Sequence, residues 1–314
     1  MRDPGTPRLA VLIPCYNEAA TIAGVVSGFR AALPDATIYV YDNNSRDETA
    51  ARATAAGAVV RREALQGKGY VVRRMFADID ADIYVLVDGD GTYDPAAAAA
   101  MVAKLQADGL DMVTGTRVSA RAEAYRPGHR FGNRLLTGMV QAVFGNRVSD
   151  MLSGYRVFSR RFVKSFPALA AGFEIETELT VHALELRMAL AEVPTAYGAR
   201  PEGSVSKLNT YRDGFRILRT ILMLVKEERP LQFFSLCAAV FLMMGLTLGL
   251  PVVVTFFRTG LVPRLPTAVL ASALVLLAFL SFALALILDS VAHGRREMKR
   301  LMYLGIPPVP RGPT

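Results

Sequence analysis

The chain has 314 residues, enough for one large domain or two small ones, and 52% of them are hydrophobic. This fraction is high for a purely soluble protein, and it accompanies a formal net charge of +8 at pH 7. Positive charge can serve nucleic-acid binding, but the sequence has no zinc-finger, RNP-like or basic-zipper pattern. Phosphate ligands and a membrane surface explain the charge better, so we expect no nucleic-acid partner.

The N-terminal residues and the two cysteines indicate in which cellular compartment the polar part of the chain lies. Residues 1–7 contain no apolar core of the kind that a signal peptide needs, so we expect the large polar part to stay in the cytoplasm. Cys15 and Cys237 lie far apart in the sequence, and no disulfide is expected. Both observations fit a reducing compartment.

Predicted strands and helices alternate along the first part of the chain. Strands are predicted at 8–13, 37–41, 58–61, 83–87 and 112–114, and helices at 19–32, 48–56, 67–77 and 95–107. This alternation predicts an α/β fold with a mainly parallel sheet and right-handed crossovers. Ligands of such sheets lie beyond the carboxyl ends of the strands, so the polar residues that follow each strand are candidate site residues.

Two carboxylates follow the predicted strand at 83–87. Asp88 and Asp90 are hard oxygen donors two residues apart, and both can bind one divalent cation whose remaining ligands come from phosphate. A surface Asp-Gly turn would have the same local sequence, so the motif alone leaves both interpretations open.

Two further strand ends carry polar candidates. Asp42 can accept hydrogen bonds from a nucleobase or a ribose, but it can equally cap the next helix, and residues 43–45 are ordinary turn formers. Lys68, between Gly67 and Gly69, is a candidate phosphate contact. It does not belong to a Walker loop, because the required glycine spacing is missing.

The motifs occur in a characteristic order. They are Pro14-x-Tyr16-Asn17-Glu18, Asp42-Asn-x-Ser-x-Asp47-x-Thr49, Gly67-Lys-Gly69, Asp88-Gly-Asp90, Gly115-Thr-Arg117, Asp150-x-x-Ser153-Gly-Tyr-Arg156, Glu174-Ile-Glu176 and Arg200-x-x-Gly203 followed by Lys207. From about Val11 to Lys207 the chain resembles the inverting glycosyltransferases of family 2 with the GT-A fold. Within them it is similar to the polyprenyl-phosphate glycosyltransferases, a group that includes dolichol-phosphate mannose synthase and bacterial undecaprenyl-phosphate glucosyltransferases.

The resemblance implies a donor site and a cofactor. It places Pro14, Tyr16, Glu18 and Asp42 around the base and ribose of a nucleoside diphosphate sugar, and we add Asn44 and Lys68 to this donor site. It places Asp88 near the nucleotide and the metal, and makes Asp90 the principal ligand of Mg²⁺ or Mn²⁺. One departure is Thr92, where dolichol-type enzymes tend to have Gln. The absence of Trp disfavours the processive members of the family, which carry a Gln-x-x-Arg-Trp motif.

Residues 117–164 are strongly basic, and a helix predicted at about 129–145 is amphipathic. Such a helix can lie in a bilayer interface, although packing on the domain's own sheet is a close alternative. Candidate contacts for an acceptor phosphate are Arg117, Arg130, Arg134, Arg200 and Lys207. Arg117 is the strongest of them, because its planar guanidinium can bind a phosphate bidentately. The alternative to catalysis by these cations is a general base, for which Asp150 is the candidate. A phosphate acceptor that is already dianionic would not need such a base.

Two long uncharged runs follow an amphipathic juxtamembrane helix at 208–230. They cover 231–257 and 265–288, and at ~1.5 Å per residue each exceeds a ~30 Å hydrocarbon core. Two tandem runs favour transmembrane helices over buried soluble ones. Basic residues flank the pair, and Gly245-x-x-x-Gly249 is a weak indication of a homo-oligomer.

These features define four expected segments. Residues 1–207 form the catalytic domain, 208–230 the juxtamembrane helix, 231–289 the two spans and 290–314 a basic cytoplasmic tail. We expect the core to be complete before Leu231, and both termini to be cytoplasmic by the positive-inside rule.

The sequence supports one main hypothesis of function and two rivals. The main one is inverting transfer of a single sugar from a UDP- or GDP-hexose to a polyprenyl phosphate at the cytoplasmic membrane face. The rivals are a glycosyltransferase with another acceptor, and a membrane subunit that binds nucleotide sugars without chemistry. The sequence does not identify the sugar.

Overall fold

The computed structural model describes residues 7–118, 129–145, 147–201 and 210–309, with the backbone alone described at 129–135 and 210–213. The chain divides into two compact units. The first comprises residues 1–221 and 299–314, and the second comprises residues 222–298.

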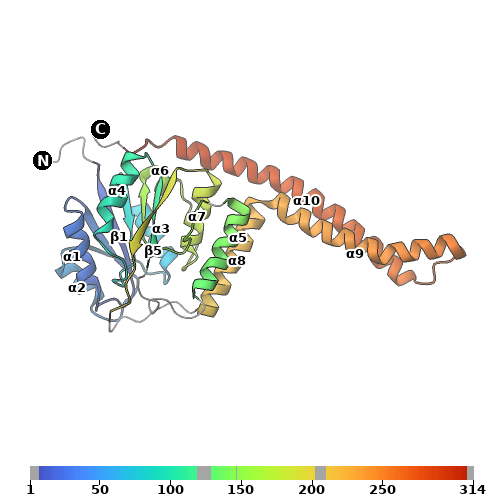
Figure 1. Cartoon of the computed structure of the whole chain (residues 1–314), viewed down its shortest axis with the longest axis horizontal. Coiled ribbons are helices and arrows are strands. Elements are labelled where there is room, and N and C mark those ends of the chain that lie inside the picture. Colours follow the sequence, from blue (N-terminus) through green and yellow to red (C-terminus); the bar gives the residue numbers. More distant parts are fainter. Residues whose placement is uncertain (1–6, 119–128, 146, 202–209, 310–314) are drawn as a thin grey trace. The chain divides into compact units, whose positions relative to one another are not determined.

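The first unit is built on a sheet with helices packed around it (Figure 1). The sheet has seven strands in the order β3-β2-β1-β4-β6-β5-β7. The strands are β1 Leu9–Cys15, β2 Thr37–Asp42, β3 Val59–Arg62, β4 Ile83–Leu86, β5 Met112–Val118, β6 Arg156–Ser159 and β7 Leu190–Ala196. Only the pairings of β6 with β4 and β5 are antiparallel. The predicted α/β fold with a mainly parallel sheet is therefore confirmed, and β6 and β7 are additions that the sequence did not predict.

Helices cover both faces of the sheet. The helices are α1 Ile22–Ala32, α2 Thr49–Ala55, α3 Lys68–Asp78, α4 Ala97–Ala107, α5 His129–Phe144, α6 Arg160–Ser165 and α7 Ile175–Glu185. Because strand side chains alternate between faces, Val11 and Ile13 pack in one core with α1 and α4. Ala10 and Leu12 pack in the other core with α3, α6 and α7.

The strand directions bring the candidate site together. Strands β1, β2 and β4 are mutually parallel, and β5 runs in the same sense as β4 because β6 is antiparallel to both. The carboxyl ends of all four strands therefore meet at one edge of the sheet. Asp42, Asp88 and Arg117 follow or end three of these strands.

The amphipathic helix α5 lies against the first unit. Its residues Leu136, Val140 and Phe144 are buried, and the helix packs on α7. Protein thus covers at least this part of the apolar face, although the contact is with helix α7 and not with the sheet. The interfacial placement of α5 stays a prediction.

The second unit contains the two apolar runs. Helix α8 (Thr210–Glu228) leads into α9 (Pro230–Thr259), which is followed by α10 (Leu265–Leu304). Helices α9 and α10 are long and apolar enough to cross a membrane, and 11% and 22% of their most apolar windows are buried. Gly245 lies against α10, where an added Cβ would be 2.9 Å from Val275 Cγ2. The two expected apolar helices are confirmed.

The end of α10 corrects the expectation that the core is complete before Leu231. Residues 299–304 belong to the first unit, and Tyr303 is 7% exposed within the core that contains α3, α6 and α7. Its hydroxyl donates to Asp111 Oδ2 at 2.8 Å. Part of the expected tail is therefore a structural element of the sheet domain.

Candidate active site

Asp42 ends β2, next to the end of β1. It is 8% exposed, its Oδ2 accepts a hydrogen bond from the Ser45 amide at 3.3 Å, and its Oδ1 is buried without a partner among the described residues. The neighbouring segment 14–18 is held alongside, because the Asn17 amide donates to Ser45 Oγ at 2.9 Å and the Glu18 amide to Thr49 Oγ1 at 2.8 Å. The structure thus brings Pro14, Tyr16, Glu18 and Asp42 to one place.

Asn44 and its neighbour Asn43 connect the end of β2 to the turn that carries Lys68. The side-chain Nδ2 of Asn44 donates to the Ala64 carbonyl at 2.9 Å. Asn43 is more deeply buried; its Nδ2 donates to the Leu65 carbonyl and its Oδ1 accepts from the Gly67 amide, both at 2.7 Å. The sequence marked Asn43 only as a turn residue, because its partners lie more than twenty positions away.

Two glycines place Lys68. An added Cβ at Gly67 or Gly69 would lie 2.2 Å from the carbonyl oxygen of Ala171 or Ala170, and Gly67 has φ of 142°. The turn can therefore lie directly on this backbone only with glycine at both positions. Lys68 Nζ is held 2.5 Å from Asp88 Oδ1 and also pairs with Glu176 Oε1.

Three carboxylates, those of Asp88, Asp90 and Glu176, interact electrostatically around Lys68. Burial raises the pKa of Asp88 to about 6, where the lowering by Lys68 is opposed by the charges of Asp90 and Glu176. Burial opposes the charge of Lys68, but the two carboxylates outweigh it and raise its pKa. Glu176 is 5% exposed, and its Oε2 has no partner among the described residues. Sequence reasoning noted Glu176 within a motif but did not assign it to the site.

Asp90 is buried and pairs with a cation of its own. Its Oδ1 accepts hydrogen bonds from the amide and the hydroxyl of Thr92, at 3.1 and 2.6 Å, and its Oδ2 lies 2.6 Å from Arg200 Nη2. Thr92 therefore orients the carboxylate. Arg200, a predicted acceptor contact, lies at the carboxylate, and its Nη1 is buried without a partner among the described residues.

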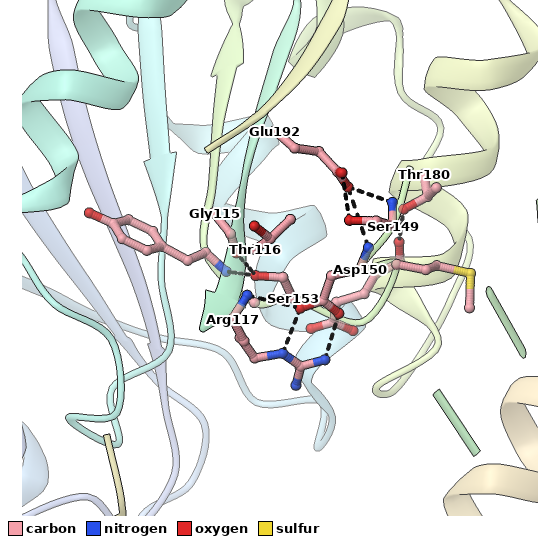
Figure 2. Close-up of polar contacts among 12 residues, drawn as sticks. Gly115, Thr116, Arg117, Ser149, Asp150, Ser153, Thr180 and Glu192 are labelled. Carbon is pink, nitrogen blue, oxygen red and sulfur yellow. Dashed lines mark hydrogen bonds and ion pairs between the residues drawn. The ribbon is translucent and has the colours of Figure 1, made fainter. Parts of the chain in front are cut away.

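Arg117 and Asp150 form a bidentate pair (Figure 2). Arg117 Nε and Nη2 donate to the two oxygens of Asp150 at 2.8 and 2.6 Å, and the Arg117 amide also donates to Asp150 at 3.2 Å. Burial opposes the charge of Arg117, but the bonds to Asp150 outweigh it and raise its pKa. The guanidinium carbon lies 5.7 Å from the ring centroid of Tyr197.

The remaining predicted acceptor contacts are not placed in the site by this structure. Arg130 and Arg134 lie on α5, where only the backbone is described, and Lys207 lies outside the described residues. Their roles stay predictions.

The described residues fit an open metal site better than a closed one. They contain no cluster of three or more His, Cys, Asp or Glu side chains arranged to hold a metal ion. Asp88 and Asp90 nevertheless supply hard oxygen donors, and the charge of Asp90 raises the pKa of Asp88. Glu176 Oε2 has no partner in the part of the chain that the structure describes. Two carboxylates suit a divalent cation that takes its other ligands from phosphate and water.

Residues 10–166 match the model of the family described as "Glycosyl transferase family 2". An uncharacterised protein of Shigella flexneri is 58% identical over 49% of this chain and 94% of its own length. The glycosyltransferase AglJ of Haloferax volcanii is 36% identical over 74% of this chain and 77% of its own length. A dolichyl-phosphate hexose transferase of the same organism is 28% identical over 70% and 95%.

Among solved structures, glucosyl-3-phosphoglycerate synthase of Mycobacterium tuberculosis is similar to this chain. Its complex with Mn²⁺, UDP-glucose and phosphoglyceric acid has a TM-score of 0.57 and 25% identity, covering 69% of this chain and 79% of that one. The same enzyme has also been solved with Mg²⁺ and UDP.

Proposed function

Because the chain belongs to glycosyl transferase family 2, we propose that it transfers one hexose, with inversion, from a nucleoside diphosphate sugar to a polyprenyl phosphate at a membrane surface. One observation carries this proposal: a single chain combines a cluster of carboxylates and cations at the strand ends with two helices whose apolar side chains are mostly exposed. The cluster suits a charged, water-soluble donor, and the helices suit an acceptor with a hydrocarbon tail.

The donor is proposed to bind along the ends of β1, β2 and β4. Asp42 Oδ1 is a buried acceptor that has no partner within the described part of the chain, which suits recognition of a base or a ribose hydroxyl. Pro14, Tyr16, Glu18 and Asn44 border the same end of the sheet. The solved neighbour's complex with UDP-glucose supports a nucleotide sugar as the donor.

Asp88 and Asp90 are proposed to hold Mg²⁺ or Mn²⁺. A divalent cation there would neutralise the negative charge that develops on the departing diphosphate. Lys68 and Arg200 lie against the same two carboxylates and add fixed positive charge beside the leaving group. Thr92 keeps Asp90 in one orientation through two hydrogen bonds.

The acceptor chemistry needs cations more than it needs a base. A phosphate with a second pKa near ~6 is largely dianionic at neutral pH and can attack the anomeric carbon directly. Asp150, the alternative base, is bound through both oxygens to Arg117, so its carboxylate already serves as an acceptor for that guanidinium. Arg117 is thereby fixed in place as the main proposed contact, and Arg130, Arg134, Arg200 and Lys207 remain further proposed contacts.

Helices α9 and α10 are proposed to span the cytoplasmic membrane as a hairpin. Arg258 and Arg264 lie between the spans, whereas the ends carry more positive charge. The residues near those ends are Arg216, Arg219, Lys226, Arg229, Arg295, Arg296, Lys299 and Arg300. By the positive-inside rule both termini and the catalytic unit then face the cytoplasm, where nucleotide sugars are made.

A donor panel tests the function. The purified chain is incubated with Mn²⁺, undecaprenyl phosphate and radiolabelled UDP-glucose, UDP-N-acetylglucosamine or GDP-mannose. We expect label in the organic phase with at least one donor. Donor binding without turnover across the panel would support the binding subunit instead. Label on added 3-phosphoglycerate, and none in lipid, would identify a soluble phosphate acceptor of the kind bound in the solved neighbour.

A further inference from the structure

Residues 149–154, the Ser149–Gly154 loop, contact both halves of the candidate site. At one end Asp150 binds Arg117 through both carboxylate oxygens. At the other end the Gly154 backbone lies against Asp88, since an added Cβ at Gly154 would be 2.3 Å from Asp88 Oδ2. A displacement of this loop would therefore change the surroundings of a proposed acceptor residue and of a proposed metal ligand.

The carboxylate of Glu192 holds the first end of the loop (Figure 2). Glu192 lies on β7, and its Oε1 accepts from the Ser149 amide at 2.7 Å and from the Asp150 amide at 3.3 Å. Its Oε2 accepts from the Ser149 hydroxyl at 2.6 Å. Both backbone donors beside Asp150 are thus satisfied by one side chain.

The guanidinium of Arg156 holds the middle of the loop. Arg156 is fully buried, and it donates to the carbonyl oxygens of Met151 and Ser153, the latter at 3.0 Å, and to Thr180 Oγ1 at 2.9 Å. No carboxylate of the described residues lies within ion-pair distance. A buried cation with neutral acceptors is costly to desolvate, so the contribution of Arg156 lies in the geometry that it imposes on the loop.

Other contacts anchor the loop to β5 and to Tyr93. Ser153 Oγ donates to the Gly115 carbonyl at 2.6 Å, and the Gly154 amide donates to the Tyr93 hydroxyl at 2.8 Å. The loop has no ladder of its own, so side chains satisfy its backbone groups. Glu192 accepts from its N–H groups and Arg156 donates to its carbonyls.

We propose that Glu192 and Arg156 are positioning residues that set the Ser149–Gly154 loop, and through it Arg117 on the acceptor side and Asp88 on the donor side. The assignment of the two sides rests on the proposed function. Glu192 acts at the Asp150 end alone. Arg156 acts at the centre of the loop, so its influence reaches both ends.

Glu192→Ala, made in the full-length chain, tests whether Glu192 positions Arg117 on the acceptor side. We expect faster amide hydrogen exchange in peptides covering 147–156, and a loss of kcat/KM for undecaprenyl phosphate of about tenfold to a hundredfold with the donor KM unchanged. Glu192→Gln should restore most activity, because its amide oxygen accepts the same two N–H bonds and its NH₂ can donate to Ser149 Oγ. Glu48→Ala, which removes an exposed carboxylate, is the control.

A double-mutant cycle separates positioning from any other effect of Glu192. If Glu192 acts through Asp150, adding Glu192→Ala to Asp150→Asn should cost little beyond Asp150→Asn alone. Losses that simply multiply would overturn the proposed path from Glu192 to Arg117. Unchanged hydrogen exchange in Glu192→Ala would also overturn it.

Arg156→Lys tests the second positioning residue, since it keeps the charge but not the three directed bonds. We expect weaker Mn²⁺ binding and faster exchange of the loop, whereas Glu192→Ala should leave Mn²⁺ binding unchanged. The matched control is Arg160→Met, at a half-exposed surface pair. Equal Mn²⁺ binding in Arg156→Lys and wild type would overturn the proposal that Arg156 positions Asp88 through the loop. Mn²⁺ binding and hydrogen exchange can both be measured without an acceptor. If the wild-type chain transferred no sugar to lipid, the proposed function would be wrong, and these two measurements would still decide whether Glu192 and Arg156 position the loop.

Discussion

Asp90 is the residue whose charge the proposed chemistry needs most. Asp90→Asn keeps an oxygen for the Thr92 bonds but removes the charge that faces Arg200 and the proposed cation. We expect transfer to fall by about a hundredfold or more while the fold is retained, because charge on the departing diphosphate is no longer offset. Activity at saturating Mn²⁺, together with circular dichroism, measures both.

Asp94→Asn is the matched control for this change. Asp94 lies in the same loop, is exposed, and accepts from the Ala96 amide at 2.9 Å, a bond that Asn can replace. Near-normal activity is expected. If Asp90→Asn were equally active, Asp90 would have no part in the mechanism.

Protons and Mn²⁺ should compete for the carboxylate of Asp88. Burial and the neighbouring carboxylates raise its pKa to about 6, so the carboxyl is charged at pH 7 and mostly protonated at pH 5. Mn²⁺ needs the charged form, and its affinity should be about tenfold weaker at pH 5 than at pH 7. Titration calorimetry checks this. Asp88→Asn should bind Mn²⁺ weakly and equally at both values; a wild-type affinity independent of pH would contradict the prediction.

Sequence reasoning located some site residues and missed others for a definite reason. Asp42, Asp88 and Asp90 follow predicted strands, and parallel strands bring such residues to one edge. The partners of Lys68 include Glu176, 108 positions away, and Arg200 reaches Asp90 across a similar separation. No local spacing encodes these pairs, because tertiary packing alone makes them neighbours.

At the level of elements, β6 and β7 were missed because neither has the pattern of a buried strand. Strand β6 has four residues and begins with Arg156, which is buried by bonds to loop carbonyls rather than by apolar character. Strand β7 is an edge strand with Glu192 and Pro194 and is mostly half-exposed. The central strand β4, buried throughout, was predicted correctly.

The end of α10 should behave as part of the sheet domain. Tyr303→Phe removes the bond to Asp111, a carboxylate that is 3% exposed, and should lower the free energy of unfolding by about 1–3 kcal/mol. The thermal midpoint of the detergent-solubilised chain measures this. Met302→Ala, at an exposed position on the same turn, should change it little. Equal midpoints for Tyr303→Phe and wild type would show that the Asp111 bond adds no stability.

For the whole molecule, length and the absence of charge were sufficient to predict α9 and α10 from the sequence. They could not show that α10 continues to Leu304 and that Tyr303 enters the core of the first unit. The basic residues 295–300 look like an ordinary flank of a membrane helix. Lys299 instead pairs with Glu185, whose side chain is 4% exposed, at 2.8 Å, a contact that only the folded chain reveals.

Two deletions separate the membrane role of the helices from the structural role of this last segment. In one variant residues 231–298 are replaced by a flexible Gly/Ser linker of about 30 residues, and in the other residues 231–314 are removed. Only the second loses the Tyr303 ring from the core, so it should be less stable by about 3–5 kcal/mol.

The linker variant should bind UDP and Mn²⁺ like the full chain and use a short-chain, water-soluble polyprenyl phosphate. It should glycosylate long-chain acceptor in liposomes poorly, because nothing then holds the site at the bilayer. Full activity on the embedded acceptor would disprove the anchoring role of α9 and α10. Equal stability of the two deletions would show instead that residues 299–314 are dispensable to the fold.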